Sequence, residues 1–109
     1  MSSYCVVLVT AKNKTEARKI ARGLLQEQLI ACANIIDGVE SLFTWKGRVT
    51  KSSEALLVMK TRLKIFKQVE ACVKRLHSYQ TPEIIALPVG QGSGEYFQWM
   101  DDVLIKEAK

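Results

Sequence analysis

The segment 31–60 constrains the fold of this chain more than any other, because its apolar residues recur with a period close to two. Such alternation is typical of half-buried β-strands. Asp37 and Gly38 interrupt the pattern and predict a bulge, since glycine accepts backbone angles that other residues avoid. Lys46 and Gly47 predict the tight turn between two long strands. We therefore expect a long hairpin that is buried at its base and protrudes at its tip.

Strands and helices are predicted on both sides of this hairpin. Apolar runs over 4–9 and 83–89 predict two further strands. An amphipathic helix follows Asn13, whose spacing from Glu16 fits a capping box in which each side chain accepts from an amide of the first turn. A second helix is expected to begin at Thr61, which can cap it, and a third lies near the C-terminus.

The predicted order is β-α-β-β-α-β followed by a helix. Two interleaved right-handed crossovers in one antiparallel sheet give an α+β fold, the ferredoxin-like sandwich, and we expect a single domain over residues 1–109. Helices cover one face of such a sheet. Its other face, together with Phe43 and Trp45 near the hairpin tip, needs a different cover. A homo-oligomer that packs open faces together is the economical solution.

Composition and charge narrow the classes of function. Sixteen Lys and Arg against eleven Asp and Glu leave a net charge of +5 without a basic tail, and 47–60 holds no aromatic residue, so no nucleic-acid partner is expected. No apolar segment is long enough to cross a bilayer, so no membrane partner is expected either. Three cysteines without a framework spacing indicate reduced thiols and a cytoplasmic location.

Residue spacing by itself gives little support for a chemical site. One histidine and no Gly-x-Ser-x-Gly sequence predict a protein that is not an enzyme of the common triad types. Cys32, Cys72 and His77 are the only thiolate and imidazole candidates, and no Cys-x-x-Cys is present. Cys72 belongs to a helical apolar stripe, whereas Cys32 could be packed or exposed. His77 lies at a helix C-terminus, where its charged form is favoured, and the glycines at 90–94 predict a simple loop.

Five motifs together resemble, in order and spacing, the CutA divalent-cation tolerance family. The resemblance implies a ferredoxin-like homotrimer with strand pairing between subunits, and binding of copper or another divalent cation. It covers essentially the whole chain. The motifs are Leu-Ile-Ala-Cys-Ala-Asn-Ile at 29–35, Val-Glu-Ser-Leu-Phe-Thr-Trp-Lys-Gly at 39–47, Leu-Leu-Val-Met-Lys-Thr-Arg at 56–62, Leu-His-Ser-Tyr-Gln-Thr-Pro-Glu-Ile at 76–84, and Tyr-Phe-Gln-Trp at 96–99.

The resemblance also implies site residues. Cys32 and His77 match positions of the family's proposed metal ligands, and Glu83 is a candidate oxygen donor. Ser78 stands where the family usually has proline, and Lys12 and Asn13 where it often has Pro-Asp, which removes a carboxylate near the site. A pocket between subunits is expected to involve Trp45, Lys60 and Tyr79.

Two other functions fit the same fold. One is a trimeric regulatory module, like the nitrogen-signalling PII proteins, that reads a small anionic ligand between subunits through Lys60, Arg62 and the loop at 90–94. The other is a trimer that serves protein interaction, with Cys32 merely packed.

Overall fold

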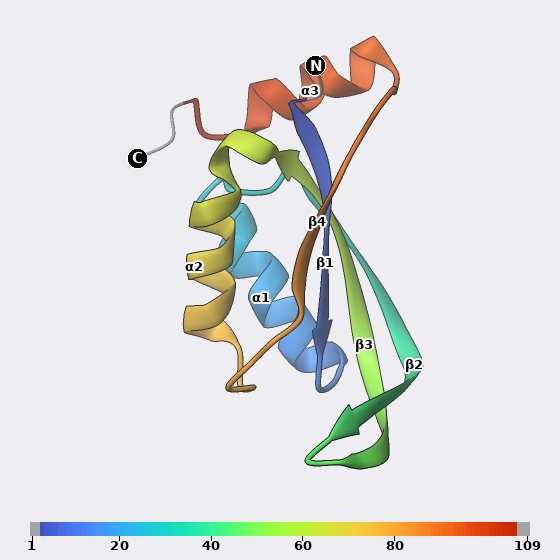
Figure 1. Cartoon of the computed structure of the whole chain (residues 1–109). Coiled ribbons are helices and arrows are strands. Elements are labelled where there is room, and N and C mark those ends of the chain that lie inside the picture. Colours follow the sequence, from blue (N-terminus) through green and yellow to red (C-terminus); the bar gives the residue numbers. More distant parts are fainter. Residues whose placement is uncertain (1–2, 107–109) are drawn as a thin grey trace.

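A computed structural model describes residues 3–106 and contains one four-stranded sheet with helices (Figure 1). In chain order the elements are β1 (Tyr4–Ala11), α1 (Lys14–Gln26), β2 (Cys32–Trp45), β3 (Arg48–Arg62), a 3₁₀ turn (Leu63–Ile65), α2 (Phe66–Leu76), β4 (Ile84–Pro88) and α3 (Gly94–Val103).

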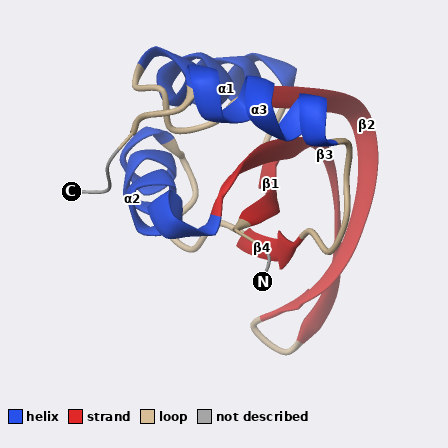
Figure 2. Ribbon diagram, turned by 90° about the horizontal axis from the view of Figure 1, so that it is seen from above, coloured by secondary structure: helices blue, strands red, loops and turns tan. Residues whose placement is uncertain are grey.

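The sheet order is β2-β3-β1-β4, and every neighbouring pair is antiparallel. This order confirms the predicted ferredoxin-like arrangement. Helices α1 and α2 lie side by side on one face of the sheet, and α3 crosses its end (Figure 1, Figure 2). Inward-facing residues of β1 and β3 pack against α1 and α2 as the core. Fully buried members include Val7, Val9, Leu57, Met59, Ile20, Leu24, Val69 and Val73.

The start of α1 confirms half of the predicted capping box. The Asn13 side chain accepts a hydrogen bond from the Glu16 amide at 2.9 Å. The Glu16 carboxylate does not return the bond to Asn13, and instead accepts from the amide of Lys12 at 3.0 Å. The first turn is still capped, because the Asn13 side chain satisfies one of its orphan donors, the Glu16 amide.

The prediction that Thr61 caps the second helix is wrong. Thr61 is the penultimate residue of β3, is fully buried, and donates its hydroxyl to the carbonyl of Leu29 at 2.6 Å. A buried hydroxyl is costly unless it is hydrogen-bonded, and this bond keeps Thr61 in the strand. The chain then passes through the 3₁₀ turn, and α2 begins at Phe66 without a side-chain cap.

The hairpin of β2 and β3 has the predicted bulge and turn. Ile36 pairs with Leu56 but Val39 pairs with Glu54, so β2 holds one residue more than β3 between these pairs. Gly38 lies in the bulge at φ +70°. The tip turns at Lys46 and Gly47, both with positive φ, as a type I′ hairpin turn requires.

The outer part of this hairpin extends beyond the sheet as a two-stranded arm, Val39–Glu54. Strand β1 pairs with β3 only from Ala55 onward, so no third strand supports the arm. Trp45 is 56% exposed and Val49 is 81% exposed. The arm therefore protrudes, as the sequence predicts.

The face of the sheet opposite α1 and α2 is apolar and largely bare; we call it the open face. Its side chains come from alternate positions of all four strands, among them Val6, Leu8, Ile36, Leu56, Val58, Ile85 and Leu87. Ile36, Ile85 and Leu87 are each nearly half exposed, at 49%, 48% and 47%. Only one end of this face is covered, where Phe97 of α3 stacks on Tyr4 with ring centroids 4.1 Å apart.

Candidate functional site

Five of the six predicted site residues fall into two groups near opposite ends of β1, and Trp45 lies apart from both at the tip of the arm. Cys32 and Lys60 lie near α3, whereas His77, Tyr79 and Glu83 lie beyond the other end of β1. The pairing along β3 gives the distance between the two groups. Cys32 pairs with Lys60 of β3. Thr10, whose carbonyl contacts His77, pairs with Leu56 of β3, four residues away from Lys60. Four strand residues correspond to roughly 14 Å. One copy of the chain therefore does not bring Cys32 and His77 together.

Cys32 is the first residue of β2 and is half-buried. Its Sγ lies 3.3 Å from the hydroxyl oxygen of Tyr96 on α3, close enough for a hydrogen bond. The bond to Cys32, together with burial, raises the pKa of Tyr96 to about 12. All three cysteines are free, as predicted, and Cys5 and Cys72 are buried. Cys32 is thus the one thiol of the chain with solvent access.

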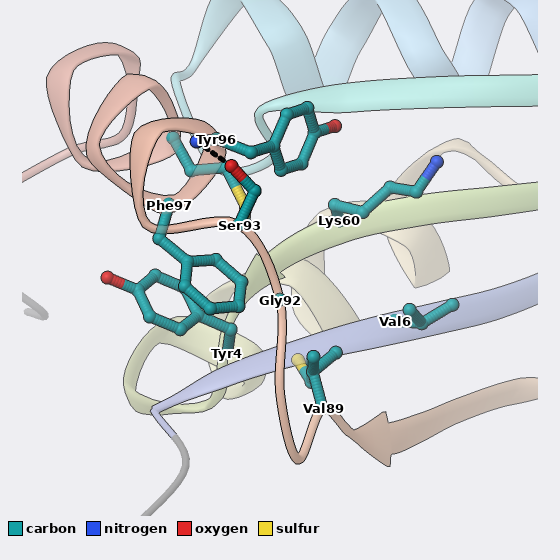
Figure 3. Close-up of a pocket in the computed structure, with 10 residues that line it drawn as sticks. Tyr4, Val6, Lys60, Val89, Gly92, Ser93, Tyr96 and Phe97 are labelled. Carbon is teal, nitrogen blue, oxygen red and sulfur yellow. Dashed lines mark hydrogen bonds between the residues drawn. The ribbon is translucent and has the colours of Figure 1, made fainter.

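Lys60 lies near the C-terminal end of β3 and pairs with Cys32 of β2. Its ammonium group donates a hydrogen bond to the side-chain oxygen of Asn34, two residues along β2 on the same face. The aliphatic stem borders a cavity of about 480 Å³ beneath the start of α3, which we call the α3 pocket (Figure 3). Its walls include Tyr4, Val6, Lys60, Val89, Tyr96 and Phe97.

His77 lies just after α2, where the sequence places it, and both of its ring nitrogens have a hydrogen-bond partner. The side chain is fully buried. Its Nε2 lies 2.7 Å from the carbonyl oxygen of Thr10, and its Nδ1 accepts from the Tyr79 amide at 3.0 Å. A carbonyl can only accept and an amide can only donate, so Nε2 carries the proton and Nδ1 does not. These two contacts hold the ring in one orientation after the end of α2.

Two buried carboxylates lie near His77 and Tyr79, Glu16 beside the imidazole and Glu54 beside the Tyr79 hydroxyl. Glu16 accepts from the Ser78 amide at 2.8 Å and lies 4.0 Å from His77 Nδ1. Burial opposes ionisation of Glu16, but hydrogen bonds from Ser78 and Lys12 outweigh it and lower the pKa. Glu16 thus ties the segment after α2 to the start of α1.

Tyr79 donates its hydroxyl to Glu54 at 2.7 Å, at the point where the arm leaves the sheet. Burial, and then this hydrogen bond, raise the pKa of Tyr79 to about 12. Sequence reasoning missed Glu54. Its only signal is an acidic residue directly before the apolar run at 55–59, and that signal does not reveal the partner.

The predicted ligand set does not fit a metal ion within one chain. Both nitrogens of His77 are already used, so the ring has no lone pair to offer. Glu83 is exposed and precedes β4, level with the His77 end of the sheet. Among residues 3–106, no group of three His, Cys, Asp or Glu side chains is placed to hold a metal.

The residues expected in an inter-subunit pocket are likewise spread along β3. Trp45 is at the arm tip, Tyr79 bonds Glu54 at the base of the arm, and Lys60 lies at the far end. The residues predicted to bind a small anion in the alternative function are only partly brought together. Lys60 and Gly92 of the glycine loop border the same α3 pocket, whereas Arg62 donates to the carbonyl of Ile105.

No helix within the described part of the chain has the length and apolar character needed to span a membrane.

Comparisons with known proteins agree on one family. The sequence model of the family described as CutA1 divalent ion tolerance protein matches residues 5–103. The divalent-cation tolerance protein CutA of Thermus thermophilus is 43% identical over 95 residues, which are 87% of this chain and 92% of that protein. The chloroplastic CutA protein of Arabidopsis thaliana is 42% identical over 95 residues, and the matched part is 52% of its length.

Solved structures give the same result. The crystal structure of CutA1 from Oryza sativa matches with a TM-score of 0.94 and 36% identity, over 97% of both chains. The periplasmic divalent cation tolerance protein CutA from Archaeoglobus fulgidus matches with a TM-score of 0.89 and 37% identity, over 92% of this chain and 97% of that chain. The fold and the sequence therefore point to the same relatives.

Proposed function

Because the chain belongs to the CutA divalent-cation tolerance family, we propose that it is a homotrimer that binds copper or a similar cation and catalyses no reaction. The observation that carries this proposal is the open face. A bare apolar sheet face is unusual on a monomer and marks an interaction surface.

The arm supports assembly independently of the open face. A two-stranded ribbon without a third strand or a helix beside it is marginally stable in water. Here the exposed side chains of Trp45 and Val49 add apolar area to that ribbon. Packing the arm against another copy would bury this area, and a trimer is the assembly that the family resemblance implies.

Cation binding is proposed at Cys32. Its thiol is accessible and has a single side-chain partner, Tyr96. Thiolates select soft ions such as Cu(I), and zinc. Cys32 and Glu83 retain accessible donor atoms, but they lie at opposite ends of one sheet, so other ligands must come from a second copy. His77 acts as a structural residue in this proposal.

A copper titration tests the proposal directly. We expect calorimetry to show binding to the wild-type chain and at least tenfold weaker binding to Cys32→Ser. A Cys72→Ala variant is the matched control, because its thiol is buried in the core. We expect His77→Gln to leave copper affinity unchanged where circular dichroism shows that it folds.

Equal copper affinity of the wild type and Cys32→Ser would remove Cys32 from the site. Loss of affinity in a folded His77→Gln variant would instead show that the imidazole turns to bind the ion. Elemental analysis of protein purified without chelators or affinity tags gives the stoichiometry.

We further propose a cytoplasmic location, supported by the three unpaired cysteines. Cell fractionation with an antibody against the untagged chain tests it.

A further inference from the structure

The bulge in β2 holds the only Asp-Gly sequence of the chain, at Asp37 and Gly38. An aspartate followed by glycine can close into a cyclic imide, because the backbone nitrogen of the glycine attacks the side-chain carboxyl carbon of the aspartate. A regular strand or helix hinders this reaction, since the attacking amide is held in a backbone hydrogen bond. Whether the pair reacts therefore depends on its local geometry.

Three observations place Asp37 and Gly38 for this reaction. Neither residue is paired with β3, because the pairing passes from Ile36 to Val39 across the bulge. The Gly38 amide instead donates to Oδ1 of Asp37 at 2.9 Å, so the nitrogen already faces the carboxyl group that it would attack. Gly38 is exposed and has no Cβ to obstruct the approach, and a Cβ built there would meet no atom within 4 Å. The nucleophile, the carboxyl group and solvent water are thus together.

The Asp37 carboxylate is also weakly held. Its side chain is 58% exposed, and its ion-pair partner is the Lys14 ammonium group at 3.9 Å, itself 48% exposed. Exposed pairs of this kind are weak, so the carboxyl group is free to take up a proton from solvent. Asp101 and Asp102 differ, because both lie in α3. The amide that follows each of them belongs to the hydrogen-bonded helix.

We propose that Asp37 is a site of spontaneous isomerisation, at which the folded chain converts aspartate to isoaspartate. The carboxylate first takes up a proton from solvent. The Gly38 nitrogen then forms a bond to Cγ of Asp37, its own proton passes to the departing oxygen, and one water leaves as the imide closes. Water adds back at the main-chain carbonyl carbon of Asp37 and breaks the bond from that carbon to the Gly38 nitrogen. The new carboxylic acid returns a proton to solvent.

The product changes the junction between the sheet and the arm. Its backbone passes through Cβ and Cγ of residue 37, so the chain gains one methylene group in the bulge where the arm begins. The proposal depends neither on copper binding nor on assembly, and it is tested without either.

Incubation of the folded full chain near pH 7, with peptide mapping by mass spectrometry at intervals, tests the proposal. Isoaspartate is recognised by labelling with an isoaspartyl methyltransferase and by resistance to a protease that cleaves only at aspartate. We expect conversion at Asp37 at a rate within threefold of that of an unstructured peptide of residues 34–41, and none at Asp101 or Asp102. Because the unfolded form of a stable domain is a very small fraction, such a rate must come from the folded chain.

Three variants and a control identify the reacting atoms. Gly38→Ala adds a methyl group beside the attacking nitrogen, and Asp37→Glu requires a six-membered ring, so each should slow conversion at least tenfold. Asp37→Asn offers ammonia as a better leaving group and should convert at least tenfold faster, with release of ammonia. Gly90→Ala leaves the pair untouched and should convert at the wild-type rate. Circular dichroism shows whether each variant is folded.

Two results would overturn the proposal. Conversion in the folded chain more than threefold slower than in the peptide would show that the bulge, or a second copy packed on it, shields the pair. Equal rates for the wild type and a folded Gly38→Ala variant would exclude attack by the Gly38 nitrogen.

Discussion

At the scale of single residues, Glu16 makes several hydrogen bonds that no other side chain replaces. It accepts from the amides of Lys12 and Ser78, and so connects the start of α1 with the segment after α2. His77 rests beside it with both nitrogens engaged. A buried carboxylate with such donors is stable only as the anion.

The first prediction concerns the pH dependence that follows from Glu16. Its folded-state pKa lies below the unfolded value, so its contribution is present above about pH 4.3 and is lost as the pH falls through the folded pKa. Glu16→Gln should therefore lower the free energy of unfolding by about 1–3 kcal/mol at pH 7 and by much less at pH 3. Urea unfolding at the two pH values measures the difference.

A matched control for this variant is Glu40→Gln on the arm. Glu40 forms an exposed ion pair with Lys51 at 3.7 Å, and exposed pairs contribute little to stability. An equal effect of Glu16→Gln at both pH values would show that its ionised form is not what matters.

At the scale of elements, local chemistry decided what could be predicted. The bulge at Gly38, the turn at Gly47 and the cap at Asn13 each depend on residues within a few positions, and all three are present in the structure. Thr61 was misplaced because its partner, the carbonyl of Leu29, is 32 residues away. Local propensity yields to such tertiary contacts.

The candidate site was harder to predict for the same reason. The carbonyl that holds Nε2 of His77 belongs to Thr10, which is 67 residues away in sequence. The α3 pocket depends on the stacking of Tyr4 and Phe97 from opposite ends of the chain. Its single charge, Lys60, comes from a third element. Motif spacing carries no information on which of these residues meet.

Glycine substitutions test the element scale. At Gly38, φ is +70°, a conformation that costs an L-residue about 1–2 kcal/mol, so Gly38→Ala should lower the free energy of unfolding by that amount. Gly90→Ala is the control, because its backbone is not left-handed and no atom lies within 4 Å of the added Cβ. Thermal and urea unfolding should show Gly90→Ala equal to the wild type or slightly more stable. Equal losses for both variants would contradict a special role of the bulge.

At the scale of the whole molecule, one face of the sheet is covered by helices of the same chain and the other is largely exposed. The side covered by α1 and α2 contains the buried core. The open face keeps Ile36, Ile85 and Leu87 half exposed. The chain alone therefore leaves apolar area in water that only association can bury.

The open face makes a prediction about oligomeric state. Leu87→Asp places a charge on this face at a side chain that is already half exposed in one copy, so it should cost a single subunit little while disrupting the trimer. Analytical ultracentrifugation at micromolar concentration should give trimers for the wild type and smaller species for Leu87→Asp. Lys19→Asp, on the outer face of α1, should remain trimeric. A wild-type chain that sediments as a monomer and unfolds cooperatively would contradict assembly.

The bare half of the sheet also has a consequence for the protein inside the cell. A newly synthesised copy can bury the core between its sheet and helices without a partner. It remains prone to aggregation until it assembles, because Leu87 and its neighbours on the open face are exposed as soon as the strands pair. Its yield should then depend on how fast ribosomes supply partners, since slow production lengthens the interval in which chaperones and proteases compete for the same surface.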